Sequence, residues 1–231
     1  MKSTKYRNLY KYSYSKELGR LAQGIPDVVK GTNTILFIDK ADVPTELWKY
    51  ITYGHIVVNY RPEKSDLHRT RLTVGGNLIL YPSDCGTPTV DLLTVKLLLN
   101  SIISSPGTKL LTIDIKNFYL NTPMKRFEYM RLKLSNLPED FLERYNLEPK
   151  SEKNGQIYVK IRLGMYGLPQ AGLLAQQLLE ERLNAKGYSQ ITLVPGLCTH
   201  EWRPITFTLC VGDSGVKYTG EQHTDHLMAI L

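Results

Sequence analysis

Two aspartates stand where the chain could hold a divalent metal ion. Asp114 lies near the end of a predicted strand, residues 110–115, in which apolar and polar positions alternate. Asp213 follows about a hundred residues later, at the predicted tip of a hairpin after the alternating residues 205–211. Two carboxylates at strand ends suit two-metal phosphoryl transfer, in which substrate phosphates supply the remaining ligands. The alternative is structural, with Asp114 capping the next segment and Asp213 forming a turn, and spacing alone does not decide between them.

Three short sequence words surround these aspartates and a later glutamine. They are Thr112-Ile-Asp-Ile-Lys-Asn-Phe-Tyr-Leu-Asn, Met165-Tyr-Gly-Leu-Pro-Gln-Ala-Gly and Leu209-Cys-Val-Gly-Asp-Ser-Gly-Val-Lys-Tyr. In this order they resemble three polymerase motifs of reverse transcriptases, in particular those of copia-type long-terminal-repeat retrotransposons. Upstream, Tyr60-Arg-Pro-Glu-Lys and Arg69-Thr-Arg-Leu-Thr-Val-Gly-Gly resemble the basic fingers segment of that family. The resemblance extends from about residue 53 to the C-terminus, and the three words together with the upstream basic segment, in the family's order, make a specific signal.

The resemblance implies roles for the two aspartates and for an aromatic residue near them. Asp114 and Asp213 match catalytic positions that bind Mg²⁺ or Mn²⁺. Tyr119, five positions after Asp114, matches the aromatic residue that screens the sugar of the incoming nucleotide. Without the resemblance, Tyr119 would be interpreted as an ordinary strand aromatic.

Three further residues match nucleotide-binding positions of the family. Gln170 matches the glutamine that touches the nucleotide, and Arg69 and Arg71 match the basic residues that hold its triphosphate. Guanidinium groups suit this task because they form forked, charge-assisted hydrogen bonds to phosphate oxygens. Taken alone, the two arginines could equally belong to a solvated basic loop.

The last motif departs from the family pattern. The family ends this hairpin with two adjacent aspartates, whereas this chain has Gly212 in the first place and keeps only Asp213, and Ser214 replaces a bulkier residue. Two divalent ions held roughly 3.5–4 Å apart need carboxylates to keep them in position, and glycine offers no oxygen. The departure predicts impaired or absent polymerisation, because one lost ligand can cost ~3 kcal/mol, about a hundredfold in rate.

The resemblance also implies a fold, an α+β polymerase-like palm with an antiparallel sheet and packed helices, plus a fingers subdomain. We expect a single reverse transcriptase domain over residues 1–231. Its fingers would comprise about residues 1–84 and 120–165, and its palm about residues 85–119 and 166–231. The sequence stops shortly after the last motif, so we expect a fragment of a Pol polyprotein in which the thumb, ribonuclease H, protease and integrase regions are missing.

Local patterns independently favour a mixed α+β class without strict strand-helix alternation. Residues 1–60 show weak periodicity and predict only two short strands, residues 35–38 and 55–60. Thr87 followed by Pro88 predicts the start of a helix that ends near Ile103 and, being apolar on most sides, belongs in the core. Further strands are predicted at residues 72–80, 130–134 and 157–163, and a further helix between Pro169 and Gly187.

Composition sets the broad class. The chain has 231 residues, of which 42% are hydrophobic and 22% charged, which supports a packed core. Its net charge of +7 favours an anionic partner such as nucleic acid. Three widely spaced cysteines form no disulfide framework and predict a reducing compartment. No segment predicts a signal peptide, a membrane anchor or a membrane span.

Other constellations are weaker. Cys198 and His200, with His223 and His226, offer four zinc ligands, but their spacings do not match the usual zinc motifs. The absence of a G-x-S-x-G elbow and of a P-loop excludes the commonest hydrolase and nucleotide triphosphatase signatures.

These observations lead to two functional hypotheses. The first is an RNA-directed DNA polymerase domain of a retrotransposon, a nucleotidyltransferase that uses Mg²⁺ or Mn²⁺, a primer-template of RNA or DNA and deoxynucleoside triphosphates. The resemblance implies an intracellular place for it, in cytoplasmic virus-like particles. The second is a non-catalytic nucleic-acid-binding remnant of such an element, with the same fold but without the chemistry.

Overall fold

A computed structural model describes the chain from residue 4 to residue 231 and contains two compact units. Unit 1 comprises the described residues up to Asp84 together with Tyr119–Ala171, and unit 2 comprises Cys85–Phe118 and Gly172–Leu231. Both units combine helices with sheets, which confirms the α+β class. The bounds of the units are close to those expected for fingers and palm, and those two names stay a prediction.

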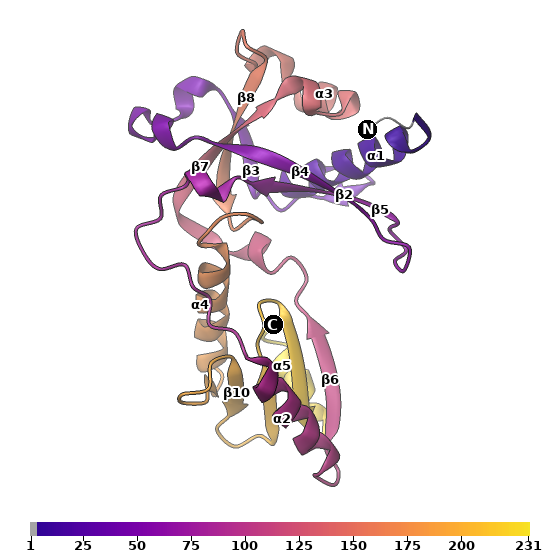
Figure 1. Ribbon diagram of the computed structural model, residues 1–231, viewed down its shortest axis with the longest axis vertical. Helices are drawn as coiled ribbons and strands as arrows, with labels where there is room; N and C mark the ends of the chain where they lie inside the picture. The colour runs from indigo at the N-terminus through magenta and orange to yellow at the C-terminus, as the bar shows by residue number, and fades with distance from the viewer. Residues whose placement is uncertain (1–3) are drawn as a thin grey trace. The chain divides into compact units, whose positions relative to one another are not determined.

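Unit 1 contains a five-stranded sheet in the order β3-β8-β7-β4-β5 (Figure 1). Its strands are β3 (Ile35–Ile38), β4 (Thr52–Tyr60), β5 (His68–Val74), β7 (Pro123–Lys133) and β8 (Gln156–Leu163), and a separate pair joins β1 (Gly24–Ile25) to β2 (Val29–Lys30). Neighbours in the five-stranded sheet are antiparallel except β4 and β7, which pair in parallel. The predicted strand at residues 72–80 ends earlier, because the chain leaves the sheet at Gly75.

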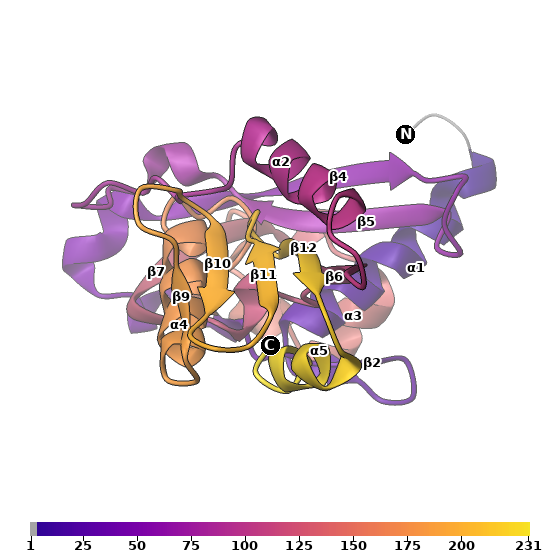
Figure 2. The same cartoon turned by 90° about the horizontal axis from the view of Figure 1, so that it is seen from below.

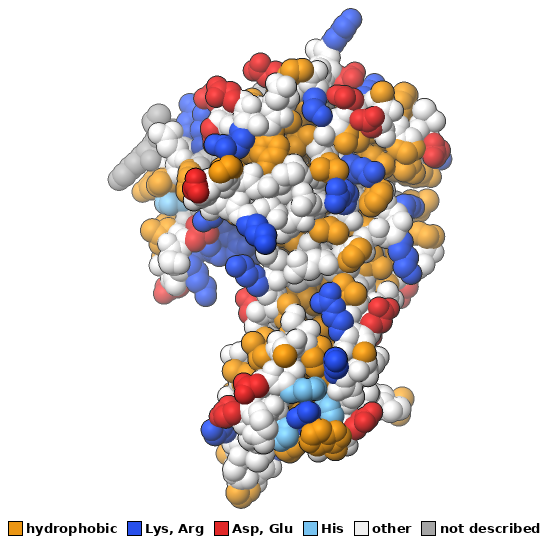
Figure 3. All heavy atoms as spheres, turned by 180° about the vertical axis from the view of Figure 1, so that it is seen from behind, with side chains coloured by type: hydrophobic (Ala, Val, Ile, Leu, Met, Phe, Trp, Pro, Cys, Tyr) orange, Lys and Arg blue, Asp and Glu red, His pale blue; other side chains and the backbone are white. Residues whose placement is uncertain are grey.

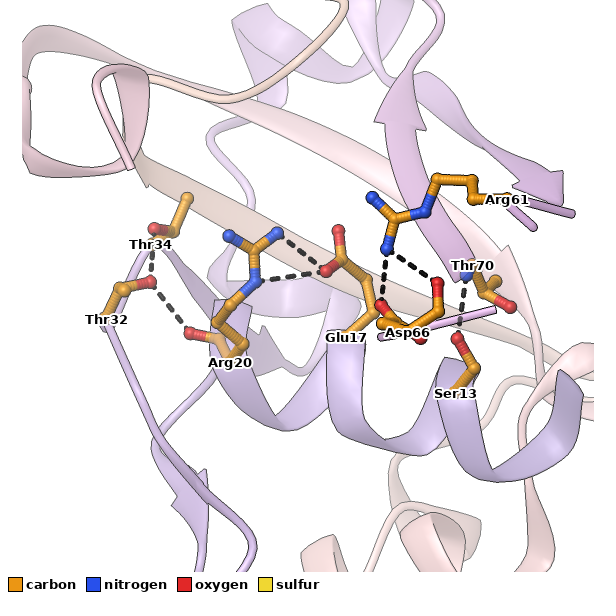
Figure 4. A network of polar contacts seen from close by, with 8 residues as sticks. All are labelled: Ser13, Glu17, Arg20, Thr32, Thr34, Arg61, Asp66 and Thr70. Carbon is orange, nitrogen blue, oxygen red and sulfur yellow. Dashed lines mark hydrogen bonds and ion pairs between the residues drawn. The ribbon is translucent and has the colours of Figure 1, made fainter. Parts of the chain in front are cut away.

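Both strands predicted in residues 1–60 are confirmed, as β3 and within β4, but the sequence patterns missed β1, β2 and the first helix, α1 (Thr4–Leu21), which packs against β5. Its buried side chains Tyr14, Leu18 and Leu21 recur at helical spacing only in its second half, so the apolar stripe is short. Polar contacts add to this packing (Figure 4): the Thr70 backbone N–H donates to Ser13 Oγ over 2.8 Å. A second contact joins α1 to α3 (Glu139–Tyr145) through a hydrogen bond between side chains.

Unit 2 contains a five-stranded sheet in the order β6-β12-β11-β10-β9. The strands are β6 (Lys109–Asp114), β9 (Tyr188–Gln190), β10 (Leu197–His200), β11 (Ile205–Thr208) and β12 (Asp213–Tyr218), and the helices are α2 (Leu92–Ile103), α4 (Ala171–Asn184) and α5 (Glu221–Met228). Residues of α4 and α5 join the sheet in one buried cluster, which includes Ile113, Leu179, Phe207, Val216 and Leu227. Helix α2 lies on the opposite face of this sheet (Figure 2).

The predicted start of α2 is wrong. The helix begins at Leu92, and its N-cap is Asp91, whose carboxylate accepts a hydrogen bond of 2.7 Å from the Thr94 backbone N–H. The Val90 backbone N–H donates to the Leu209 carbonyl over 3.1 Å, which keeps the segment after Thr87 extended. A tertiary hydrogen bond therefore moves the start of the helix to a position after Thr87 and Pro88, the residues where the sequence predicted it.

The predicted burial of α2 is also wrong, because Leu98 is its one buried side chain. The exposed apolar side chains of the helix are Leu92, Leu93, Leu97, Leu99 and Ile103. The sheet face beneath α2 is partly polar: the Lys217 ammonium donates to the Ser101 and Ser105 hydroxyls at 3.2 and 3.1 Å. Although α2 is strongly apolar, no helix within residues 4–231 is long and apolar enough to cross a membrane.

The three thiols should differ in reactivity. Burial raises the pKa of the Cys198 thiol to about 12, whereas Cys210 is exposed. Because the thiolate is the reactive form, we expect iodoacetamide at pH 8 to modify Cys210 rapidly and Cys198 only after unfolding. Mass spectrometry of the native and urea-unfolded chain measures this, with Cys210→Ser as the control that removes the fast label. Equal native rates at Cys198 and Cys210 would contradict the packing of β10.

Candidate functional site

The two aspartates lie side by side in unit 2. Asp213 is the register partner of Asp114 across the antiparallel strands β12 and β6, and both side chains are exposed. The Ile115 backbone N–H donates to the Gly212 carbonyl over 2.8 Å, and Asp213 directs its own backbone N–H and carbonyl toward Cys210. The aspartates therefore form a non-hydrogen-bonded pair, in which the Cα atoms lie about 4.5 Å apart and the side chains share one face of the sheet.

The hairpin that presents Asp213 differs from the predicted one. Cys210 and Asp213 exchange backbone hydrogen bonds of 2.9 and 3.1 Å, so the two-residue loop consists of Val211 and Gly212. Asp213 is therefore the first residue of β12 and not the tip of the hairpin. The turn-forming residues Asp, Ser and Gly suggested a tip at Asp213, but pairing with β6 extends the strand to this residue.

The loop is strained at Val211, which has a φ of 60°. Positive φ is unfavourable for a β-branched residue because its side chain clashes with the backbone. Gly212 lies outside the left-handed region, so positive φ occurs only at the first loop position, as in a type II′ turn. Strained backbone of this kind is concentrated at functional sites in proteins.

The electrostatics of the pair favour a cation. Like charges directly opposite each other on neighbouring strands repel. Within the part of the chain that the structure describes, no ion pair with Lys, Arg or His is formed by Asp114 or Asp213. Carboxylate oxygens are the ligands that Mg²⁺ prefers, and Mg²⁺ is often held by only one or two carboxylates plus substrate phosphates and water. The donor set fits such an ion, although residues 4–231 contain no group of three or more His, Cys, Asp or Glu side chains placed to bind one.

The two arginines of the predicted triphosphate site lie in unit 1, two positions apart on β5 and therefore on the same face of the strand. Burial, together with the neighbouring guanidinium groups of Arg71 and Arg61, lowers the pKa of Arg69. Arg61 is held at the end of the hairpin by a 2.7 Å ion pair with Asp66 (Figure 4). Two of these three cations, Arg69 and Arg71, have no ion pair among the described residues, so this end of the β4–β5 hairpin can accept an anion.

Tyr119 lies in unit 1, where it contacts the aromatic ring of Tyr166. Its ring meets the ring of Tyr166 edge to face, with centroids 5.3 Å apart and an angle of 89°. The Arg71 guanidinium lies over the same Tyr166 ring, with Cζ 5.0 Å from the ring centroid. The structure thus brings Arg71 and Tyr119 to the same aromatic ring.

Gln170 is buried in unit 1, with 1% of its surface exposed. Its Nε2 donates to Glu128 Oε1 over 3.3 Å, and its Oε1 is buried without a partner. Arg126 donates to the same Glu128 oxygen at 2.7 and 3.0 Å. Contact with a nucleotide would require the carboxamide to leave Glu128.

The predicted site residues thus form two groups. Asp114 and Asp213 adjoin each other in unit 2, and Arg69, Arg71 and Tyr119 belong to unit 1. Gln170 also belongs to unit 1, where it is buried and its carboxamide is hydrogen-bonded to Glu128.

The sequence patterns did not single out Tyr166, Glu128 or Val211. Tyr166 lies within one of the family-like words, but a tyrosine there looks like any core aromatic. Glu128 carried no signal, because an acidic residue in an alternating strand is normally solvated. Val211 was hidden by the turn propensity of the residues that follow it.

The histidines considered as zinc ligands belong to unit 2, and Figure 3 shows His side chains gathered on one face of the protein. His200 and His226 have ring centroids 5.8 Å apart, and His223 contacts the ring of Trp202. His200 Nε2 donates to the Lys186 carbonyl over 3.0 Å, and its Nδ1 accepts from the backbone N–H groups of Trp202 and Arg203. These rings pack and hydrogen-bond within the protein, and they are not grouped for metal binding in the described chain.

No family model and no curated protein matches the sequence. The functional assignment therefore depends on the residues and their geometry.

Divalent metal should stabilise unit 2 through the aspartate pair. We expect millimolar Mn²⁺ to raise the melting temperature of the unaltered chain by a few degrees. Asp114→Asn and Asp213→Asn should abolish this rise and, without metal, unfold at the same or a higher temperature, because they remove repulsion worth up to about 1 kcal/mol. Thermal unfolding with and without Mn²⁺ measures both effects. Asp225→Asn, at another exposed aspartate, is the matched control, and an undiminished Mn²⁺ shift in Asp114→Asn would refute the metal assignment.

Relief of the strained turn should stabilise the protein. Val211→Gly removes the side chain that conflicts with positive φ, and we expect a gain of about 1 kcal/mol in the free energy of unfolding. Val211→Ala keeps the Cβ atom and should gain much less. Urea unfolding of the three proteins measures the difference, and a less stable Val211→Gly would show that this turn is not strained.

Proposed function

We propose that the chain is a nucleotidyl-transfer domain of the reverse transcriptase type, which uses a divalent ion held by Asp114 and Asp213 and acts on a primer-template and a deoxynucleoside triphosphate. The observation that carries the proposal is the direct pairing of these two carboxylates at the ends of β6 and β12. A structural role for either aspartate alone would not require the other opposite it, at a repulsive position.

Each group of residues would have its own chemical role. Asp114 and Asp213 would hold Mg²⁺ or Mn²⁺, which when bound supplies positive charge to phosphoryl oxygens. Arg69 and Arg71 would neutralise the triphosphate through forked hydrogen bonds. Tyr119 would contact the sugar of the nucleotide. The surplus of basic side chains, +7 overall, favours association with the phosphates of a primer-template.

We also propose that Gly212 impairs this copy. A carboxylate at position 212 would stand beside the Asp114–Asp213 pair, where the backbone already bonds to Ile115. A Cβ atom built on Gly212 lies 3.3 Å from the Phe118 Cβ and 3.5 Å from the Ile115 carbonyl oxygen. The first of these contacts is tight, so an aspartate here requires the Phe118 Cβ to move by a few tenths of an ångström, and the φ of Gly212 lies outside the region that favours glycine.

The second candidate is a nucleic-acid-binding remnant without chemistry, and the glycine at position 212 is the observation that favours it. Both candidates keep the arginines of β5 and predict binding of a primer-template. Only the first predicts nucleotide incorporation.

Primer extension on an RNA template with Mg²⁺ or Mn²⁺ distinguishes the two candidates. We expect Gly212→Asp to extend the primer at least about a hundredfold faster than the unaltered chain, because it supplies the missing carboxylate. Gly212→Asn has the same size without the charge and should stay at the level of the unaltered chain. Adding Asp114→Ala to Gly212→Asp should abolish extension.

Rapid extension by the unaltered chain would refute the impairment. If Gly212→Asp folds, binds the primer-template and still adds no nucleotide, the polymerase assignment fails and the binding remnant stands. Circular dichroism and filter binding provide the two checks.

A further inference from the structure

Tyr166 lies where two distant segments of unit 1 meet. Its carbonyl accepts a hydrogen bond of 2.8 Å from the Val74 backbone N–H, at the end of β5. The next residue, Gly167, has a φ of 93°, and a Cβ atom there would lie 2.1 Å from the Val74 carbonyl oxygen. A Cβ atom on Gly76 would likewise lie 2.3 Å from the Gly167 carbonyl oxygen. Close backbone contacts, which only glycine permits, therefore fix the position of Tyr166 independently of its own side chain.

The Tyr166 ring has two neighbours among the predicted nucleotide-binding residues. The guanidinium of Arg71 lies over it at 5.0 Å, within the range of a cation–π interaction. The ring of Tyr119 meets it edge to face at 5.3 Å. Tyr166 is half-buried, so one ring can support two partly exposed side chains.

The side chain of Arg71 can be oriented by its contact with the Tyr166 ring. Its Nε is buried without a hydrogen-bond partner, and it forms no ion pair among the described residues. A long arginine side chain loses considerable rotamer entropy when it is fixed, and the aromatic contact lowers the cost of holding it ready for an anion.

We infer that Tyr166 is a positioning residue, whose ring orients Arg71 toward a triphosphate and Tyr119 toward the sugar of the same nucleotide. This inference rests on the proposed function, since it takes the nucleotide as the ligand of Arg71 and Tyr119. It assigns to Tyr166 no contact with the nucleotide.

Equilibrium binding of dCTP to the full chain, in Mg²⁺, tests the inference without catalysis. Tyr166→Phe keeps the ring and should bind dCTP like the unaltered chain. Tyr166→Leu should weaken binding about three- to tenfold, the range expected for a lost cation–π contact. Arg71→Ala should weaken binding at least as much, and adding Tyr166→Leu to it should cause little further loss, because both changes remove one coupled interaction. Binding of dCMP, which lacks the outer phosphates, should change little in any of these variants.

A second readout concerns the sugar. Tyr166→Leu should reduce the preference for dCTP over CTP, because Tyr119 loses its support, whereas Arg71→Ala should leave this ratio unchanged. A general loss of structure would weaken both nucleotides alike. Thermal unfolding confirms that each variant is folded.

The outcomes separate this inference from the proposed function. If the unaltered chain does not bind dCTP, or if Arg71→Ala binds it normally, the proposed nucleotide site is wrong and the inference falls with it. If Arg71→Ala weakens binding and Tyr166→Leu changes neither the affinity nor the sugar preference, the nucleotide site stands and the role of Tyr166 is overturned.

Discussion

The register of β12 against β6 is the constraint on which the candidate metal site depends. Six consecutive pairs run from Tyr218 opposite Lys109 to Asp213 opposite Asp114. Because side chains alternate between the faces of a strand, a slip of one residue would move one carboxylate toward the core face. Val216, which is fully buried under α4 and α5, holds the register. Apolar packing on one face of the sheet thus decides where the charges lie on the other.

The same end of the sheet carries two unfavourable features, the repulsion between the aspartates and the positive φ of Val211. A core that is well packed elsewhere can tolerate both, and natural proteins accept such local costs mainly where function requires them. Gly212 relieves neither feature, because it has an ordinary φ and leaves the carboxylate pair intact. Glycine at this position avoids the tight contact of 3.3 Å that a Cβ atom would make with the Phe118 Cβ, although its φ does not require glycine.

Sequence patterns predicted the features that local chemistry determines. Alternation in residues 110–115 located β6, and the helix that ends before Gly187 was placed correctly, since Gly187 has the positive φ of a helix stop. Features set by tertiary contacts were missed. The start of α2 depends on a hydrogen bond to the Leu209 carbonyl, and the exposure of α2 depends on the polar sheet face beneath the helix. The adjacency of the two aspartates could be proposed from the family-like words, but only strand pairing places them opposite each other. The burial of Gln170 depends on Glu128, a distant residue that no local pattern marks.

Because the candidate residues are divided between the two units, a substitution in one unit can remove one activity of the site and leave the other. The carboxylates belong to one compact unit, whereas Arg71, Tyr119 and Tyr166 belong to the other, each group held by contacts within its own unit. A substitution in the β11–β12 loop therefore acts in the unit that holds the aspartates and leaves the contacts among the cations and aromatic rings unchanged. Binding of phosphates, which depends on the cations, can outlast catalysis, which needs the carboxylates. Under the proposed function, a chain with glycine at position 212 would for this reason lose nucleotide transfer before it loses affinity for nucleic acid.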